Sequence, residues 1–269
     1  KKGQNYQREI YPMEPEKLQQ VSEINILRTE LFSEAEENLK RNKDQSVFYL
    51  EAPTGSGKSN TAMNLSFTLM QENSDLRKLF YIYPFNTLVE QNMSILEKTF
   101  GNKKEIMSQI AVVNSLVPFK DKKEVEEDRE NSKKYQEILL DRQFLNYPFI
   151  LSTHVMLFRT MFGNAKEDVF GFQQLCHSVI VLDEIQSYKI NLWSEMIAFL
   201  KEFAELLDIK VIIMSATLPN LEVLTDHKEN AVRLLSDCLK YFPGESRSKI
   251  RSVRGRYNTG ILGRACSGK

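Results

Sequence analysis

The chain has 269 residues, enough for one large α/β domain with insertions or for two smaller domains. Lysine plus arginine and aspartate plus glutamate number 36 each, so no overall charge attracts the protein to nucleic acid or to a membrane. The three cysteines lack metal-ligand or disulfide spacing, and no apolar run reaches membrane-spanning length. We therefore expect a cytoplasmic protein without membrane contact. Because the first residue is Lys1, we also expect a fragment of a longer protein.

Helices and short apolar strands alternate along the chain. A polar lead-in over residues 1–21 precedes an amphipathic helix over 22–40, in which Asn25 and Arg28 lie where a nucleotide base could be recognised, although a solvated helix face is the favoured interpretation. In a later helix, we expect Leu88, Ile95 and Leu96 to be buried. The predicted strands are 47–50, 79–83, 110–113, 149–154, 178–182, 211–214 and 232–235, and the predicted later helices are 60–70, 87–100, 155–162 and 191–207.

This alternation predicts an α/β fold with a doubly wound, mostly parallel sheet in one lobe over residues 22–246. Ligands of such sheets bind beyond the carboxyl ends of the strands, and the unusual polar clusters of this chain all follow strands. The charged stretch 120–137 is expected to be an inserted solvated segment without assigned function. The basic residues 247–269 are expected to be a linker or added tail, and binding to a nucleic-acid backbone is the alternative.

The first polar cluster is Glu-Ala-Pro-Thr-Gly-Ser-Gly-Lys-Ser-Asn, residues 51–60, between a strand and a helix. Its two glycines permit the positive φ angles that turn backbone N–H groups toward phosphate, at the N-terminus of the next helix. Lys58 adds a charge for the β- and γ-phosphates, and the Ser59 hydroxyl is placed to ligate Mg²⁺. The alternative is a turn that carries a lysine by chance. The predicted nucleotide-binding residues are Pro53, Thr54, Gly55, Ser56, Gly57, Lys58, Ser59 and Asn60.

Two further clusters follow buried strands. Asp183 and Glu184 supply a carboxylate for Mg²⁺ and a second one that can polarise an attacking water, which are the two groups that phosphoryl transfer needs. An acidic helix start is the alternative, but it would explain only one carboxylate. Ser215-Ala216-Thr217 follows the strand 211–214 and could also be an ordinary turn at a strand end.

Together, residues 52–59, Asp183-Glu184-Ile185-Gln186 and Ser215-Ala216-Thr217 resemble motifs I, II and III of superfamily two helicases. More narrowly, these motifs and residues 83–92 and 151–154 resemble the first RecA-like lobe of the CRISPR-associated helicase-nucleases of type I systems. That family commonly has histidine at the position of Gln186. The resemblance implies a P-loop NTPase lobe with ATP and Mg²⁺ as cofactors, Ser59 and Asp183 as metal ligands, and catalytic roles for Lys58, Asp183, Glu184, Gln186, Ser215 and Thr217.

The same resemblance implies contact with the phosphate backbone of single-stranded DNA. Helix N-termini behind the contacting segments would donate N–H groups whatever the base. The alternatives are helix caps at Thr87 or Thr153 and a satisfied turn histidine at His154. The implied contact residues are Pro84, Asn86, Thr87, Gln91, Thr153 and His154.

Two parts of that family are not recognisable in the chain. Its nuclease requires an adjacent His-Asp pair, whereas the three histidines here are followed by valine, serine and lysine, and the arginine-rich motif of the second lobe has no counterpart. We therefore expect this chain to hydrolyse little ATP alone and to work with a second helicase lobe, a nuclease domain and a CRISPR surveillance complex. The alternatives are a lobe of an RNA helicase and a non-catalytic nucleotide-binding module.

Overall fold

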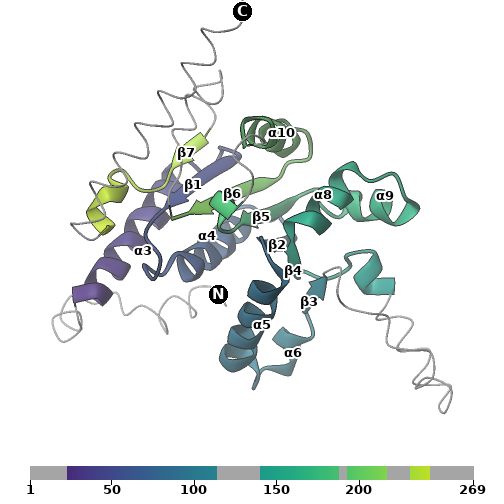
Figure 1. Ribbon diagram of the computed structural model, residues 1–269, viewed down its shortest axis with the longest axis horizontal. Coiled ribbons are helices and arrows are strands. Elements are labelled where there is room, and N and C mark those ends of the chain that lie inside the picture. Colours follow the sequence, from purple (N-terminus) through teal and green to yellow (C-terminus); the bar gives the residue numbers. More distant parts are fainter. Residues whose placement is uncertain (1–22, 114–139, 188–192, 217–230, 243–269) are drawn as a thin grey trace, which may run out of the picture.

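The computed structural model describes residues 23–113, 140–187, 193–216 and 231–242. The predicted lead-in over 1–21, the charged insertion over 120–137 and the tail over 247–269 lie outside these ranges. The described residues form a single seven-stranded sheet that carries helices on both faces, as Figure 1 shows. The candidate site residues that the structure describes lie on the strands of this sheet or on the segments that follow them.

All strand pairs in the sheet are parallel, and the strand order is β3-β4-β2-β5-β6-β1-β7. The prediction of a doubly wound, mostly parallel α/β sheet is therefore confirmed. Each strand lies within a few residues of the range that its apolar run predicts. The strands are β1 Val47–Glu51, β2 Lys78–Tyr83, β3 Ile110–Val113, β4 Phe149–Thr153, β5 Ser178–Leu182, β6 Lys210–Ser215 and β7 Ala231–Arg233.

The longer helices also follow the predicted periods, although α4 begins two residues earlier than predicted, directly after Gly57. Among the described residues, α6 and α9 were not predicted: α6 has only four residues, and α9 contains Gly171 and many polar residues, so neither shows a clear apolar period. The α-helices are α3 Glu23–Arg41, α4 Lys58–Glu72, α5 Asn86–Phe100, α6 Lys104–Met107, α8 His154–Phe162, α9 Lys166–Gln173 and α10 Trp193–Leu206, and the 3₁₀ turns are η2 Ile185–Ser187 and η4 Cys238–Tyr241.

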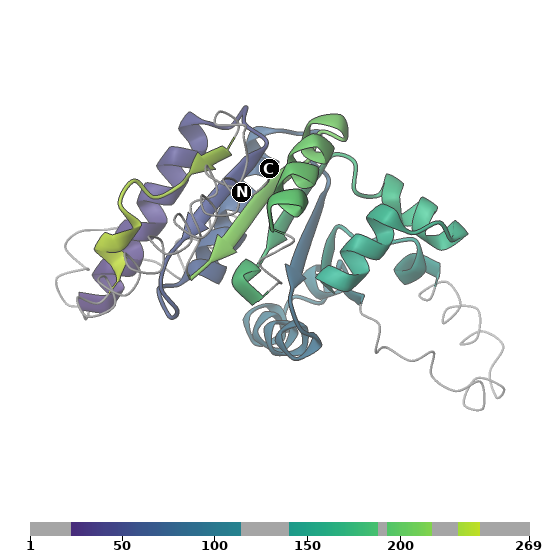
Figure 2. The same ribbon diagram turned by 45° about the horizontal axis from the view of Figure 1, so that its top comes forward.

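Alternating residues of the central strands divide between two hydrophobic cores. In β2, Tyr81 and Tyr83 belong to the core under α3, α4 and α5, whereas Phe80 and Ile82 belong to the core under α8 and α10. Figure 2 shows α4 and α10 on opposite sides of the central strands. Because both faces are covered, the strands are apolar throughout, which is why their sequences lack polar alternation. Burial of each such side chain contributes about 1.5–3 kcal/mol.

The predicted burial pattern of α5 is wrong at one position. Val89 and Leu96 are the fully buried side chains of this helix, Leu88 is partly buried, and Ile95 is 54% exposed. Residues seven apart lie on the same face of a helix, so Val89 and Leu96 share the face that contacts the sheet. Ile95 is one position away from Leu96 and is therefore rotated by about 100° toward solvent.

The strand order sets the arrangement at the carboxyl edge of the sheet. Because parallel strands all end at one edge, the segments that follow β4, β2, β5, β6 and β1 lie next to one another in that order. The phosphate-loop candidate follows β1, and the acidic pair follows β5, with β6 between them. The candidate nucleic-acid segments follow the neighbouring strands β2 and β4.

Candidate functional site

The loop between β1 and α4 is a tight turn built around two glycines. Gly55 and Gly57 have φ angles of 78° and 89°, which other residues adopt only with strain. The N–H of Ser56 donates to the Pro53 carbonyl at 3.2 Å, which closes a four-residue turn. Gly57 occupies the N-cap of α4 and has no side chain that could accept from the first N–H groups of this helix. These N–H groups therefore remain suited to an anion.

Lys58 lies across this loop. Its Nζ donates to the carbonyl oxygens of Ala52 at 2.8 Å and Pro53 at 3.1 Å, and the residue is only 6% exposed. Burial lowers the pKa of Lys58, and the charges of Glu184 and Asp183 oppose this shift. The ammonium group is thus held by neutral acceptors, which phosphate oxygens can replace with stronger, charge-assisted hydrogen bonds.

Ser56 gives an independent indication of a ligand. Its Oγ is buried and has no hydrogen-bond partner within the described residues. Buried hydroxyl groups are normally satisfied, and this one belongs to the glycine-bordered turn beside Lys58. The loop therefore fits a group rich in acceptors, such as the phosphates of a nucleotide.

Asp183 follows β5, which pairs with β2 on one side and with β6 on the other, so it lies one strand away from the end of β1. Its N–H donates to the Ile82 carbonyl at 2.9 Å, and the hydroxyl of Tyr81 lies 3.4 Å from its Oδ2. Burial and the charge of Glu184 raise the pKa of Asp183 to about 7, although Lys58 opposes the shift. A buried carboxylate of this kind gains from a divalent cation, which would favour its ionised form.

A chain of hydrogen bonds links the ends of β5 and β6. The backbone at Glu184 turns sharply, with a φ of 49°, and Gln186 donates through Nε2 to the Glu184 carboxylate. The Oγ of Ser215 donates to Gln186 Oε1 at 2.6 Å, so the Gln186 amide both donates and accepts. The Ser215 carbonyl accepts from the Ala52 N–H at 3.2 Å, which brings the end of β1 into the same arrangement. Thr217 lies outside the described residues.

The contacts of two polar residues at this edge, Tyr81 and Arg28, were not predicted from the sequence. The Tyr81 hydroxyl also hydrogen-bonds Ser59, so it lies between two candidate metal ligands. A tyrosine within a fully buried strand is the sequence signal, because a buried hydroxyl needs a partner. Arg28 is not a freely solvated side chain of α3 as expected, since its Nε and one terminal nitrogen donate to the Gly55 carbonyl at 3.0 and 2.7 Å. No sequence spacing indicates this contact, because it joins elements 27 residues apart.

The candidate nucleic-acid segments lie side by side after β2 and β4. Tyr83 pairs with Thr153, and His154 hydrogen-bonds the backbone of Tyr83 and Pro84. Burial lowers the pKa of His154, and these bonds oppose the shift. Pro84 is buried, whereas Thr87 and Gln91 are exposed.

The alternative of side-chain helix caps at Thr87 or Thr153 is not supported at this edge. The N-cap of α5 is Phe85 rather than Thr87, and it makes no side-chain cap bond. Thr153 occupies the N-cap of α8, but it is 4% exposed and its side chain also makes no cap bond. Asn86 has a buried Oδ1 with no partner among the described residues. Two neighbouring helix N-termini therefore present N–H groups without side-chain caps.

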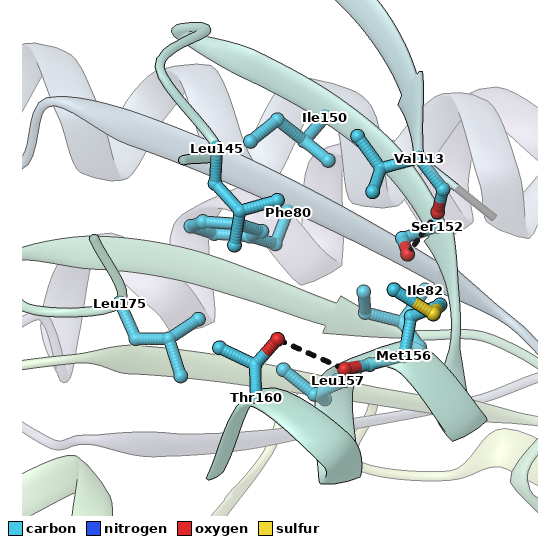
Figure 3. Close-up of a pocket in the computed structure, with 10 residues that line it drawn as sticks. All are labelled: Phe80, Ile82, Val113, Leu145, Ile150, Ser152, Met156, Leu157, Thr160 and Leu175. Atoms are coloured by element: carbon cyan, nitrogen blue, oxygen red, sulfur yellow. Dashed lines mark hydrogen bonds between the residues drawn. The ribbon is translucent and has the colours of Figure 1, made fainter. Parts of the chain in front are cut away.

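A small apolar cavity lies on the other side of these strands, between β2, β3, β4 and α8. Figure 3 shows its lining, in which Ser152 donates to the Val113 carbonyl and Thr160 to the Met156 carbonyl. Its volume of about 10 Å³ corresponds to one water molecule at most. This cavity is too small for a substrate, so it is not a candidate site.

Comparison with known proteins identifies the family to which this chain belongs. Residues 32–224 match the sequence profile of the DEAD/DEAH box helicase family. The chain belongs to this helicase family. No helix in the described part of this helicase-family chain is both long and apolar enough to cross a membrane.

The chain is also similar to individual helicases. The CRISPR-associated nuclease/helicase Cas3 of Haloferax volcanii is 23% identical over 180 residues, which cover 64% of this chain and 19% of that protein. Among solved structures, T. fusca Cas3 with ATP gives a TM-score of 0.53 at 15% identity, covering 78% of this chain and 22% of the other. The DUF1998 helicase MrfA bound to DNA and AMPPNP gives 0.51 at 17% identity, covering 81% and 29%.

These helicases are much longer than the matched region, since the chain spans only 19% of the curated relative. The resemblance to the first RecA-like lobe of the CRISPR-associated helicase-nucleases is confirmed by the family match and by these relatives.

Proposed function

We propose that the chain is the ATP-binding first lobe of an ATP-dependent helicase that moves along single-stranded DNA. The observation that carries this proposal is the electrostatic interaction of Lys58 with Asp183 and Glu184. The loop beside them also has a buried hydroxyl, on Ser56, without a hydrogen-bond partner among the described residues. The solved relatives with ATP, or with DNA and AMPPNP, support the same function.

In this function, the loop from Pro53 to Asn60 would hold the phosphates of ATP, with N–H groups at the start of α4 and the Lys58 ammonium as donors. Ser59 and Asp183 would hold Mg²⁺, and Tyr81 contacts both of these residues. When bound, the ion neutralises charge on the phosphate oxygens.

Glu184 is suited to polarise the attacking water. Its carboxylate is less buried than that of Asp183, and Gln186 restrains it through a hydrogen bond. Since Ser215 in turn fixes Gln186, a shift at the end of β6 would reorient Glu184. We infer that these residues, together with Thr217, couple ATP hydrolysis to the binding of nucleic acid at the ends of β2 and β4.

Single-stranded DNA would cross the ends of β2 and β4, with backbone phosphates at the N-termini of α5 and α8. Backbone N–H groups donate to phosphates whatever the base sequence, which suits a motor that moves along DNA. Asn86, Thr87, Gln91 and His154 lie at this edge, and the buried Thr153 would contribute through its backbone. Pro84 has no backbone N–H, so it would only shape the turn before α5.

We propose further that the longer protein acts in CRISPR interference in the cytoplasm. Its second helicase lobe would complete the ATP site, and a nuclease domain and a surveillance complex would be its partners. The similarity to Cas3 supports this assignment. Because the transition-state arginines of helicases come from a second lobe, the present chain should hydrolyse little ATP alone.

The direct test is binding of a fluorescent ATP analogue and of labelled single-stranded DNA to this chain. We expect Mg²⁺-dependent ATP binding that Lys58→Ala weakens at least tenfold, and DNA binding that this change leaves intact. Lys43→Ala, which removes an exposed ion pair with Glu72, is the matched control. Binding to RNA but not to DNA would favour an RNA helicase lobe, and ATP binding without any nucleic-acid binding would favour an interaction module.

Hydrolysis is tested in the longer protein. There, Glu184→Gln should preserve ATP binding and abolish DNA-stimulated hydrolysis, because the amide cannot polarise water as a carboxylate does. Unchanged hydrolysis would exclude the catalytic role of Glu184.

A further inference from the structure

The side chain of Arg28, a residue of α3 outside the phosphate loop, holds the tip of that loop. Its Nε and one terminal nitrogen donate to the Gly55 carbonyl at 3.0 and 2.7 Å, and its other terminal nitrogen donates to Asn25 Oδ1 at 3.1 Å. All three guanidinium nitrogens are thus engaged, two of them on a single acceptor. A planar, always charged group is suited to such a fixed geometry.

The helix that carries Arg28 is rigidly held. Starting one turn further along α3, Leu31, Phe32, Ala35 and Leu39 are almost fully buried, and α3 packs against α4. Asn25, one turn before Arg28, orients the guanidinium from the same helix. The Gly55 carbonyl is therefore tied to the frame of the fold rather than to another part of the loop.

This contact determines which way the loop's peptide groups face. The carbonyl and the N–H of one planar peptide unit point in opposite directions, so holding the Gly55 carbonyl outward turns the Ser56 N–H inward. There it donates to Pro53 and closes the turn that carries the buried Ser56 hydroxyl. Because Gly55 tolerates many backbone conformations, the loop needs an external restraint at this point.

We propose that Arg28 is a positioning residue that holds the Gly55–Ser56 peptide in the orientation required for phosphate binding. The proposal rests on the proposed function, since it concerns the same ATP site. Arg28 acts through the loop, so its effect reaches the phosphates whatever base the nucleotide carries. Loss of a side chain that recognises the base would instead weaken binding of ATP and leave binding of inorganic triphosphate unchanged.

The test compares ATP with inorganic triphosphate, each displacing a fluorescent ATP analogue from this chain. Arg28→Ala should weaken both about five- to tenfold and by the same factor, because the loss of one charge-assisted hydrogen-bonded anchor is of this size. Arg28→Lys should restore part of the affinity, since the ammonium still offers a donor to Gly55. Arg41→Ala, at an exposed ion pair on the same helix, is the matched control and should bind as the wild type does.

Two outcomes would overturn the proposal: unchanged affinity in Arg28→Ala, or weakened binding of ATP with unchanged binding of triphosphate. Hydrogen exchange without nucleotide provides a second readout, in which Arg28→Ala should speed exchange at Ser56 and Gly57 and Arg41→Ala should not. If the wild type bound no ATP at all, the proposed function would fail, and the exchange experiment would still decide whether Arg28 restrains the loop.

Discussion

Tyr81 shows how a core side chain can also serve the site. Its ring stacks on that of Tyr83 with centroids 4.7 Å apart, while its hydroxyl reaches Asp183 and Ser59. The ring therefore belongs to the hydrophobic core and the hydroxyl to the polar edge. Burial and the neighbouring Asp183 raise its pKa, so it remains a neutral donor.

Tyr81→Phe should separate these two roles. The ring contacts are kept, so the melting temperature should stay within a few degrees of the wild type. Loss of the hydroxyl should weaken Mg²⁺-dependent ATP binding about two- to fivefold, because Asp183 and Ser59 lose the group that orients them. Titration of ATP with and without Mg²⁺ checks this, since metal-free binding should not change. An equal loss in both conditions would contradict the role assigned to the hydroxyl.

At the scale of elements, the N-terminus of α5 exposes an aromatic residue among the groups proposed for phosphate. Phe85 is 56% exposed and directly follows Pro84. Stacking of a base on such a ring contributes about 1–3 kcal/mol. Phe85→Ala should therefore weaken binding of single-stranded DNA roughly tenfold, measured by fluorescence anisotropy with an oligothymidine.

Ile95→Ala gives the matched control for Phe85, because Ile95 is about as exposed but lies roughly two and a half turns into the helix that Phe85 caps. It should leave DNA affinity unchanged. If both variants bound DNA equally well, the edge between α5 and α8 would not be the DNA site.

Glu34 of α3 fastens the segment that follows β7. Its carboxylate accepts from the Ser236 N–H at 2.7 Å and from the Tyr241 hydroxyl at 2.6 Å. Burial would raise the pKa of Glu34, but the hydrogen bonds from Tyr241 and Ser236 outweigh it, so the pKa lies below the ordinary carboxyl value. A carboxyl group with a lowered pKa stabilises the fold above its ordinary value of 4.5 and loses this contribution as the pH falls through the lowered pKa.

Glu34→Gln should thus destabilise the fold by about 0.5–1 kcal/mol at pH 7 and by less as the medium becomes acidic. Thermal unfolding at pH 7, 5 and 3 measures this difference. Glu37→Gln, an exposed carboxylate of the same helix, is the control and should show no such pH-dependent difference. A constant difference at all three pH values would mean that packing, rather than charge, is responsible.

The sequence predicts some of these elements far better than others, for physical reasons. Strands buried on both faces, such as β5, have continuous apolar runs that admit few alternatives. The α9 helix has no comparable signal, and the orientation of Ile95 depends on a rotation of only one residue. Site residues in loops and at strand ends can be predicted because their residue types are unusual there, as for Lys58 and Asp183. Contacts such as Arg28 with Gly55 arise only when distant elements pack together.

At the scale of the molecule, the balanced net charge predicts that DNA affinity depends only weakly on salt concentration. Since lysine plus arginine equals aspartate plus glutamate, and the candidate DNA edge relies on helix N-termini, few counterions should be released on binding. The logarithm of DNA affinity should fall with the logarithm of salt concentration with a slope no steeper than about −2, corresponding to roughly two or three neutralised phosphates on a single strand. Titrations between low and moderate salt check this. A slope of −5 or steeper would show that a basic surface dominates.

The position of β1 within the sheet has a consequence for the synthesis of the protein. This strand ends in the phosphate loop, yet its neighbours are β6 and β7, and Val47 pairs with Val211 and Ala231. On a ribosome, β1 therefore emerges long before either neighbour exists, and its apolar residues have no strand beside them during most of translation. The strand that leads into the proposed ATP site is thus made well before the two strands that it needs to reach its native form.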